Sequence, residues 1–129
     1  MKDLTAEWIE KAEGDYRVML RESRVIDEPS FDAVCFHAQQ CVEKYAKSFL
    51  QEHDIEFERT HDMGYLHSKC AEADPDFALY RDDFKLLDDY SVEIRYPGDA
   101  AAENDARSAV EIVARVRAFI RAKLGLAET

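Results

Sequence analysis

Apolar residues recur at steps of three and four along most of the chain, which is the spacing of one face of an α-helix. The first stripe runs from about Thr5 to Ser23, and the second, which is the most regular, from about Phe31 to Glu52. The second stripe consists of Phe31, Val34, Ala38, Cys41, Val42, Tyr45 and Phe49. Both segments are therefore predicted to be helices with one buried face.

Three further stripes follow. They predict a short helix over about residues 63–73, a helix from about Asp76 to Ile94, and a last helix from about Asn104 to Leu124. No segment alternates apolar and polar residues with the period of two that is typical of a strand. The chain is therefore predicted to be all-α, as one domain over residues 1–129. The expected architecture is an antiparallel up-and-down bundle of four long helices plus a short additional helix.

Residues that favour helix ends stand between these stripes. Ser30 and Thr60 are expected to be N-caps, because a hydroxyl there can accept a hydrogen bond from a free backbone N–H. Pro75 is expected to end the short helix or to begin the next one. Gly125 comes directly after the last stripe, in the position where a glycine most often follows a helix.

The charge limits the partners that the protein can have. With 28 acids and 17 bases, the net charge is −11, so duplex nucleic acid and anionic membranes are poor partners. The apolar runs are too short for a transmembrane helix, and the first residues do not resemble a signal peptide. The three cysteines form no CxxC pair, so we expect free thiols and a cytoplasmic location.

The charge is also unevenly distributed. Residues 72–105 contain eleven acids and three bases, whereas residues 106–125 contain five bases and one acid. One interpretation is that these are solvated helix faces, with cations near a helix C-terminus. The other is that the basic last helix of one subunit contacts the acidic segment of a second copy, which predicts a homodimer.

Three possible metal sites each lack part of the ligand set that the metal needs. A di-iron bundle needs two Glu-x-x-His pairs, and the one pair here, Glu58 and His61, lies in a predicted loop. The segment from Asp74 lacks the glycine and the glutamate of a calcium loop. His37 and Cys41 are one turn apart, but nothing nearby completes a zinc site. No metal site is predicted.

The second helix has an unusual polar face. His37, Gln40 and Lys44 are spaced i, i+3 and i+7, so they lie on one side. This face either binds a ligand through hydrogen bonds or packs against another helix. Near the end of the fourth helix, Arg95 and Tyr96 precede a Pro-Gly break, where an arginine can bind a phosphate through two hydrogen bonds or pair with a neighbouring acid. We therefore predict a phosphate-bearing ligand held by these five residues.

Four segments together resemble the HEPN domain (higher eukaryotes and prokaryotes nucleotide-binding). They are Trp8–Tyr16, Phe36–Lys44 with the sequence FHAQQCVEK, Arg59–Asp62 with RTHD, and Tyr90–Gly98, which ends in RYPG. The resemblance spans essentially the whole chain. It implies an up-and-down helical bundle, usually homodimeric, that can bind a nucleotide. It also implies a small nucleotidyltransferase-fold partner in a prokaryotic two-gene module of the toxin–antitoxin type.

Many HEPN proteins are ribonucleases with an Arg-x4–6-His motif near the start of the last helix. This chain departs from that pattern, because no histidine follows His67 and Arg95 therefore has no histidine downstream. The resemblance thus points to the non-catalytic, nucleotide-binding branch, in which these residues form no catalytic site. The alternative is an RNase-like toxin that uses an atypical set of residues.

Overall fold

The protein is a bundle of helices. The computed structural model describes residues 1–93 and 97–127, with only the backbone for residues 91–93. Its elements are α1 (Asp3–Ser23), α2 (Phe31–Glu52), α3 (Met63–Ala73), the 3₁₀ helix η1 (Pro75–Tyr80), α4 (Arg81–Glu93) and α5 (Glu103–Lys123). Within these ranges there is no strand, so the predicted all-α fold is confirmed.

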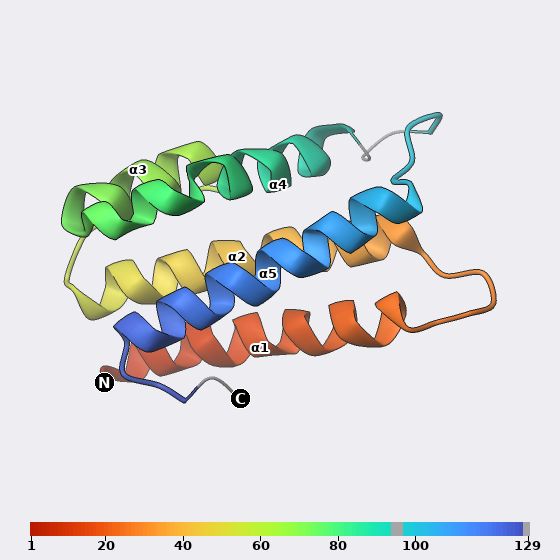
Figure 1. Cartoon of the computed structure of the whole chain (residues 1–129). Coiled ribbons are helices and arrows are strands. Elements are labelled where there is room, and N and C mark those ends of the chain that lie inside the picture. Colours follow the sequence, from red (N-terminus) through yellow and green to blue (C-terminus); the bar gives the residue numbers. More distant parts are fainter. Residues whose placement is uncertain (94–96, 128–129) are drawn as a thin grey trace.

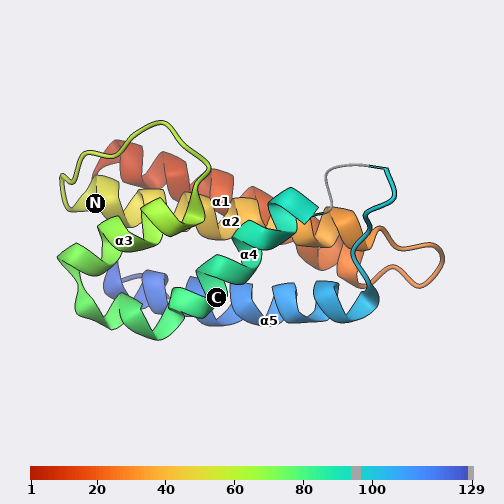
Figure 2. The same cartoon turned by 90° about the horizontal axis from the view of Figure 1, so that it is seen from above.

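Helix α2 is the centre of the bundle. It forms an antiparallel hairpin with α1, and α5 lies beside that hairpin (Figure 1). Helices α3 and α4 cover the side of α2 that faces away from α1 (Figures 1 and 2). Because α2 contacts α1, α3, α4 and α5, most of its circumference is buried, which explains why its apolar stripe is the most regular. Among the residues described, none of the helices combines the length and the apolar character that a membrane span requires.

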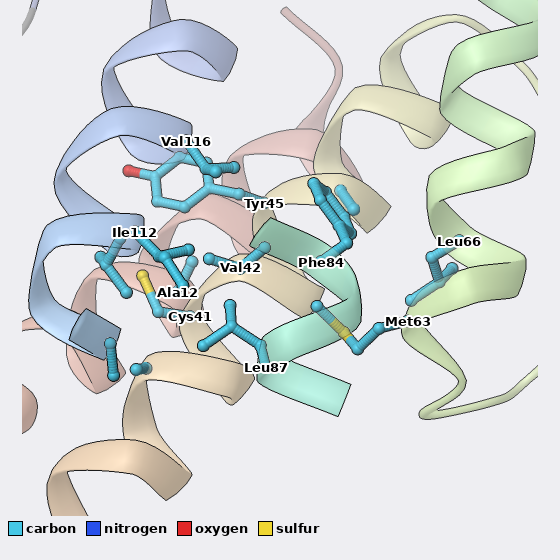
Figure 3. Close-up of a cluster of buried hydrophobic side chains, with 14 of the residues drawn as sticks. Ala12, Cys41, Val42, Tyr45, Met63, Leu66, Phe84, Leu87, Ile112 and Val116 are labelled. Atoms are coloured by element: carbon cyan, nitrogen blue, oxygen red, sulfur yellow. The ribbon is translucent and has the colours of Figure 1, made fainter. Parts of the chain in front are cut away.

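The predicted apolar stripes meet in the core. Figure 3 shows Tyr45 and Val42 of α2 between Val116 and Ile112 of α5 on one side and Phe84 of α4 on the other.

All three cysteines are fully buried, and all three are free thiols, as predicted. Burial raises the pKa of the Cys35 and Cys70 thiols to about 12. Burial also raises the pKa of the Cys41 thiol.

The helix ends agree with the sequence at Ser30, at Pro75, which begins η1, and at Gly125, but not at Thr60. Ser30 caps α2 by accepting a hydrogen bond from the Ala33 N–H. Gly125 follows α5 with a φ of 73°, and backbone bonds there close a Schellman motif. The prediction for Thr60 was wrong, because Asp62 caps α3 and accepts from the Tyr65 N–H. Thr60 instead accepts a hydrogen bond from the Asp62 N–H, so it shapes the turn before the cap.

The predicted fourth helix is divided. Residues 75–80 form the 3₁₀ helix, and the α-helix begins at Arg81. Asp74, before the proline, is extended with a ψ of 105°, the conformation that a following proline favours. Its side chain accepts a hydrogen bond from the Asp76 N–H. Ile94, the predicted end of this helix, lies outside the described residues.

Basic side chains of the last helix form ion pairs with acidic side chains of the same chain. Arg115 of α5 forms two hydrogen bonds with Asp83 of α4. Lys123 lies 2.8 Å from Asp74 and 2.6 Å from Asp76. The opposite charges of the last helix and of residues 72–105, which suggested contact with a second copy, therefore pair within one subunit. A homodimer then rests on the family resemblance rather than on charge.

Candidate functional site

A carboxylate of α1 joins two of the predicted site residues. Asp15 accepts from the His37 Nδ1 atom at 2.8 Å through one oxygen and from the Lys44 ammonium at 2.5 Å through the other. His37 and Lys44 stand two turns apart on α2, and α1 packs antiparallel to them, so Asp15 reaches both. The predicted hydrogen-bonded contact with another helix is thus what these two side chains make. We call Asp15, His37 and Lys44 the seam cluster.

The seam cluster keeps unused hydrogen-bonding capacity. His37 is 26% exposed and Lys44 21%, whereas Asp15 is 11% exposed. Because a carboxylate only accepts, the proton of the His37 ring is assigned to Nδ1, which leaves Nε2 free of a protein partner among the described residues. Lys44 uses one of its three N–H groups on Asp15. Both cation-capable groups are therefore held in place and remain accessible.

Gln40 belongs to a neighbouring set of polar residues. Its amide donates to the Gln39 side chain at 2.7 Å, and Gln39 donates in turn to Glu43. Glu43 is 2% exposed and also accepts from Lys47 and from His61, which is in the loop before α3. Gln40 is therefore at the edge of the seam cluster without bonding to it.

The other two predicted site residues, Arg95 and Tyr96, lie outside the described residues. Two further residues were not predicted from the sequence: Asp15, which belongs to the seam cluster, and Phe36, which lies beside it. Asp15 lies on the buried stripe of α1 between Ala12 and Met19. A carboxylate in a buried stripe needs a polar partner, and this was the signal in the sequence that could have indicated the site. Phe36 was quoted only as part of a motif, yet its ring is 52% exposed and packs edge-on against His37 at 5.1 Å.

A second polar cluster lies on another side of α1. Arg117 of α5 binds both carboxylate oxygens of Glu13, at 2.8 and 2.7 Å, and Tyr45 of α2 donates to the same carboxylate at 2.6 Å. Arg121 donates to the Tyr45 hydroxyl, which faces α5 (Figure 3). Arg117 also stacks on the Tyr16 ring at 4.1 Å. We call Glu13, Tyr45, Arg117 and Arg121 the buried network.

The buried network has the electrostatics of a structural contact. Burial by itself raises the pKa of Glu13, but the hydrogen bonds from Arg117 and Tyr45 outweigh it, and the net shift is downward. The pKa of Arg117 is raised, mainly by its hydrogen bonds to Glu13. Each partner therefore stabilises the charged form of the other, and three helices are joined in one place.

The HEPN domain family matches residues 5–123 of the chain. This protein belongs to the HEPN family. The match begins two residues into α1 and ends at the last residue of α5, so it covers most of α1 and the whole of every later helix that the structure describes. Membership supports a nucleotide-binding or RNase-like module in general terms. No curated protein and no solved structure matches the chain.

Proposed function

We propose that this HEPN protein is a non-catalytic binding module that holds a nucleotide at the seam between α1 and α2. The seam cluster is the observation that supports this. Asp15 positions a lysine and a histidine side by side, and both keep hydrogen-bonding groups that point to no other described residue. The buried network uses its polar groups within the protein, so the seam cluster is the better site for a ligand.

The phosphates and the base of a nucleotide each have a counterpart at the seam cluster. The remaining N–H groups of Lys44 donate to phosphate oxygens, and His37 adds a donor at Nε2 when its ring is protonated. Gln40 contributes its amide at the edge of the cluster. The half-exposed Phe36 ring offers an apolar face on which a base stacks. We expect Arg95 to add a second hydrogen-bond donor to phosphate, as predicted from the sequence, and the Tyr96 ring to offer a second surface for the base.

The affinity should be modest. Asp15 neutralises part of the positive charge of the seam cluster, and the chain carries a net charge of −11. We therefore expect a dissociation constant in the micromolar range, about −8 kcal/mol. At a hundredfold excess over that constant, a nucleotide should stabilise the fold by about 2.7 kcal/mol. For a domain of this size the melting temperature then rises by several degrees.

The test is a thermal-shift titration with ATP, GTP, their mono- and diphosphates, and inorganic tripolyphosphate. Lys44→Ala should lose the shift with every one of these compounds. Phe36→Ala should weaken the nucleotides and leave tripolyphosphate unaffected, because that compound has no base to stack. Arg95→Ala tests the residue that lies outside the described ranges.

Arg17→Ala is the matched control, because Arg17 is an exposed cation on the opposite side of α1 with no ion pair among the described residues. It should behave as the wild type does. A flat titration, or a shift that Lys44→Ala retains in full, would remove the nucleotide site and leave a protein-interaction module.

The partner belongs to the same proposal. Family resemblance supports a homodimer that associates with a small nucleotidyltransferase-fold protein, in a toxin–antitoxin-like module of a prokaryotic cytoplasm. We expect a gene for such a protein next to this one and a stable complex on co-expression. Light scattering of the HEPN chain alone should give about twice its mass of 14.9 kDa. A mass of about 15 kDa in low and moderate salt would contradict the homodimer.

One observation favours a second candidate function, the RNase-like one. A carboxylate bonded to the Nδ1 atom of a histidine is the arrangement that orients a general base, because Nε2 is then directed away to take a proton. Asp15 and His37 have this relation. In RNA cleavage, His37 would remove the proton of a 2′-hydroxyl, whose oxygen bonds to the adjacent phosphorus as the bond to the 5′-oxygen breaks. Lys44 stabilises the phosphate, and water protonates the leaving 5′-oxygen. The Arg-x4–6-His motif would then not be needed.

RNA cleavage distinguishes the two functions. The non-catalytic proposal predicts no cleavage of generic single-stranded RNA by the purified protein. Cleavage that His37→Gln abolishes, and whose rate falls at acid pH in the wild type, would instead establish the RNase-like function. Cleavage that depends on Arg95 and not on His37 would point to a catalytic centre in the residues outside the described ranges.

A further inference from the structure

Two cations of α4 lie in the acidic segment of the chain without pairing with any of the acids that the structure describes. Arg81 and Lys85 are exposed, one helical turn apart, and neither forms an ion pair with another described residue. The bases of α5 that face this acidic segment are paired, as Arg115 is with Asp83. Arg81 and Lys85 instead line a cleft of about 530 Å³ between α3 and α4. That volume is in the range of small-ligand sites.

The cleft has further donors and a buried aromatic floor. Ser68 lines it, and so does Tyr65, whose hydroxyl accepts from the Glu58 N–H and thus keeps its own hydrogen for donation. Phe84 and His67 are buried beneath, with ring centroids 5.1 Å apart. The lining of the cleft therefore offers the Ser68 and Tyr65 hydroxyls as hydrogen-bond donors in addition to Arg81 and Lys85.

Further along, the cleft is acidic. Asp62 caps α3, and Asp88 of α4 accepts from the Met63 N–H. Burial raises the pKa of Asp88, and the charges of Asp62, Asp89 and Glu43 raise it further, against the Met63 hydrogen bond. Arg81, Lys85 and Asp88 follow one another at i, i+4 and i+7 on one face of α4, so about 10 Å separates Arg81 from Asp88 along the helix.

We propose that this cleft binds a short zwitterionic peptide, with its carboxylate at Arg81 and Lys85 and its ammonium group towards Asp62 and Asp88. A chain of three extended residues spans about 10 Å, which matches the separation of the two charged ends. A polyphosphate fits less well, because its whole charge would have to lie near Asp62 and Asp88. The site is independent of the seam cluster, which is on the α1–α2 side of the bundle.

The probe is trialanine with free termini, titrated into the full chain and followed by calorimetry and by NMR shifts of residues in α3 and α4. N-acetyl-trialanine removes the ammonium group, and trialanine amide removes the carboxylate. Each should bind at least about tenfold more weakly than trialanine. Equal binding of the acetylated peptide, tighter binding of inorganic phosphate or ATP at these residues, or no binding of trialanine would overturn the proposal.

The double variant Arg81→Ala/Lys85→Ala should lose trialanine binding. Both side chains are exposed and unpaired within the described residues, so the fold should persist, as circular dichroism can check. The matched control is Arg17→Ala/Arg21→Ala, a second pair of exposed arginines one turn apart, on α1. It should bind trialanine as the wild type does. Lys44→Ala should also keep peptide binding, which separates this site from the nucleotide site.

Discussion

Glu13 and Asp15 stand two residues apart on α1, yet they lie in opposite kinds of surroundings. Glu13 faces α5 and receives three hydrogen bonds from Arg117 and Tyr45. Asp15 faces the outer side of α2 and receives one each from His37 and Lys44. Glu13 therefore bonds to both α5 and α2, whereas Asp15 bonds to α2 alone, because a step of two residues turns the side chain through about 200°.

The two clusters differ in how much hydrogen-bonding capacity their donor side chains keep after binding the carboxylate. In the buried network, Arg117 is 9% exposed and its guanidinium binds both oxygens of Glu13, a geometry that serves stability. In the seam cluster, Lys44 and His37 are more than twice as exposed and each bonds to the carboxylate through a single atom. A polar cluster whose donors are all bonded within the protein stabilises the fold. A cluster whose donors keep free N–H groups can also bind a ligand.

The largest effect should come from Arg117→Ala. It leaves the Glu13 carboxylate without its main cation and removes the ring contact with Tyr16, so we expect a loss of about 3 kcal/mol in the free energy of unfolding. Urea unfolding measures it. Arg17→Ala, an exposed arginine on the same bundle, should change stability by less than about 0.5 kcal/mol. If both variants lose equally little, the buried network is not a structural contact.

A smaller effect is expected for Tyr45→Phe. The ring stays in the core, and only the hydroxyl between Glu13 and Arg121 is lost. Two hydrogen bonds to charged groups disappear, at a cost of about 1–2 kcal/mol. The comparison with Arg117→Ala in the same urea series shows whether the network acts as one unit, because non-additive losses in the double variant indicate coupling.

Acid should weaken the buried network through Glu13. Its pKa in the fold is below the ordinary value of 4.5, so folding favours the ionised form. The stabilisation is therefore present above the unfolded pKa and is lost as the pH falls through the lower, folded value. Urea midpoints between about pH 5 and pH 3 should fall more steeply for the wild type than for Glu13→Gln. Parallel slopes would show that Glu13 carries none of this acid sensitivity.

The smallest effect on stability should come from Asp15→Asn, below about 1 kcal/mol, because its partners are partly exposed. The same change should strengthen tripolyphosphate binding, since Lys44 and His37 no longer share their charge with a carboxylate. Thermal shifts measure both. A large loss of stability, comparable with that of Arg117→Ala, would remove the distinction between the two clusters.

The sequence predicted those features that depend on neighbours along the chain. The stripes, the Ser30 cap and the Gly125 terminus each involve residues within about two helical turns, so spacing and side-chain chemistry suffice. Thr60 shows the limit of this approach. Both Thr60 and Asp62 can cap a helix, and a difference of two residues in where α3 begins decides between them.

The site was only half predictable for the same reason. His37, Gln40 and Lys44 were found from their spacing on one helix, but the carboxylate that joins two of them is 22 residues from His37. Glu13 and Arg117 are 104 residues apart, and no local pattern connects them. A polar residue at a stripe position, such as Asp15, shows that a partner exists without showing which one.

The three cysteines give this bundle a set of internal reporters. All three are fully buried, with Cys35 and Cys41 in α2 and Cys70 in α3. The thiolate is the form that attacks a thiol reagent, and burial raises the pKa of each thiol, so that form is scarce at all three positions. Labelling of the native protein must therefore wait for the helices to separate. The labelling rates at the three sites then measure how fast the bundle opens at two points in the first half of α2 and at the buried face of α3, without any engineered probe.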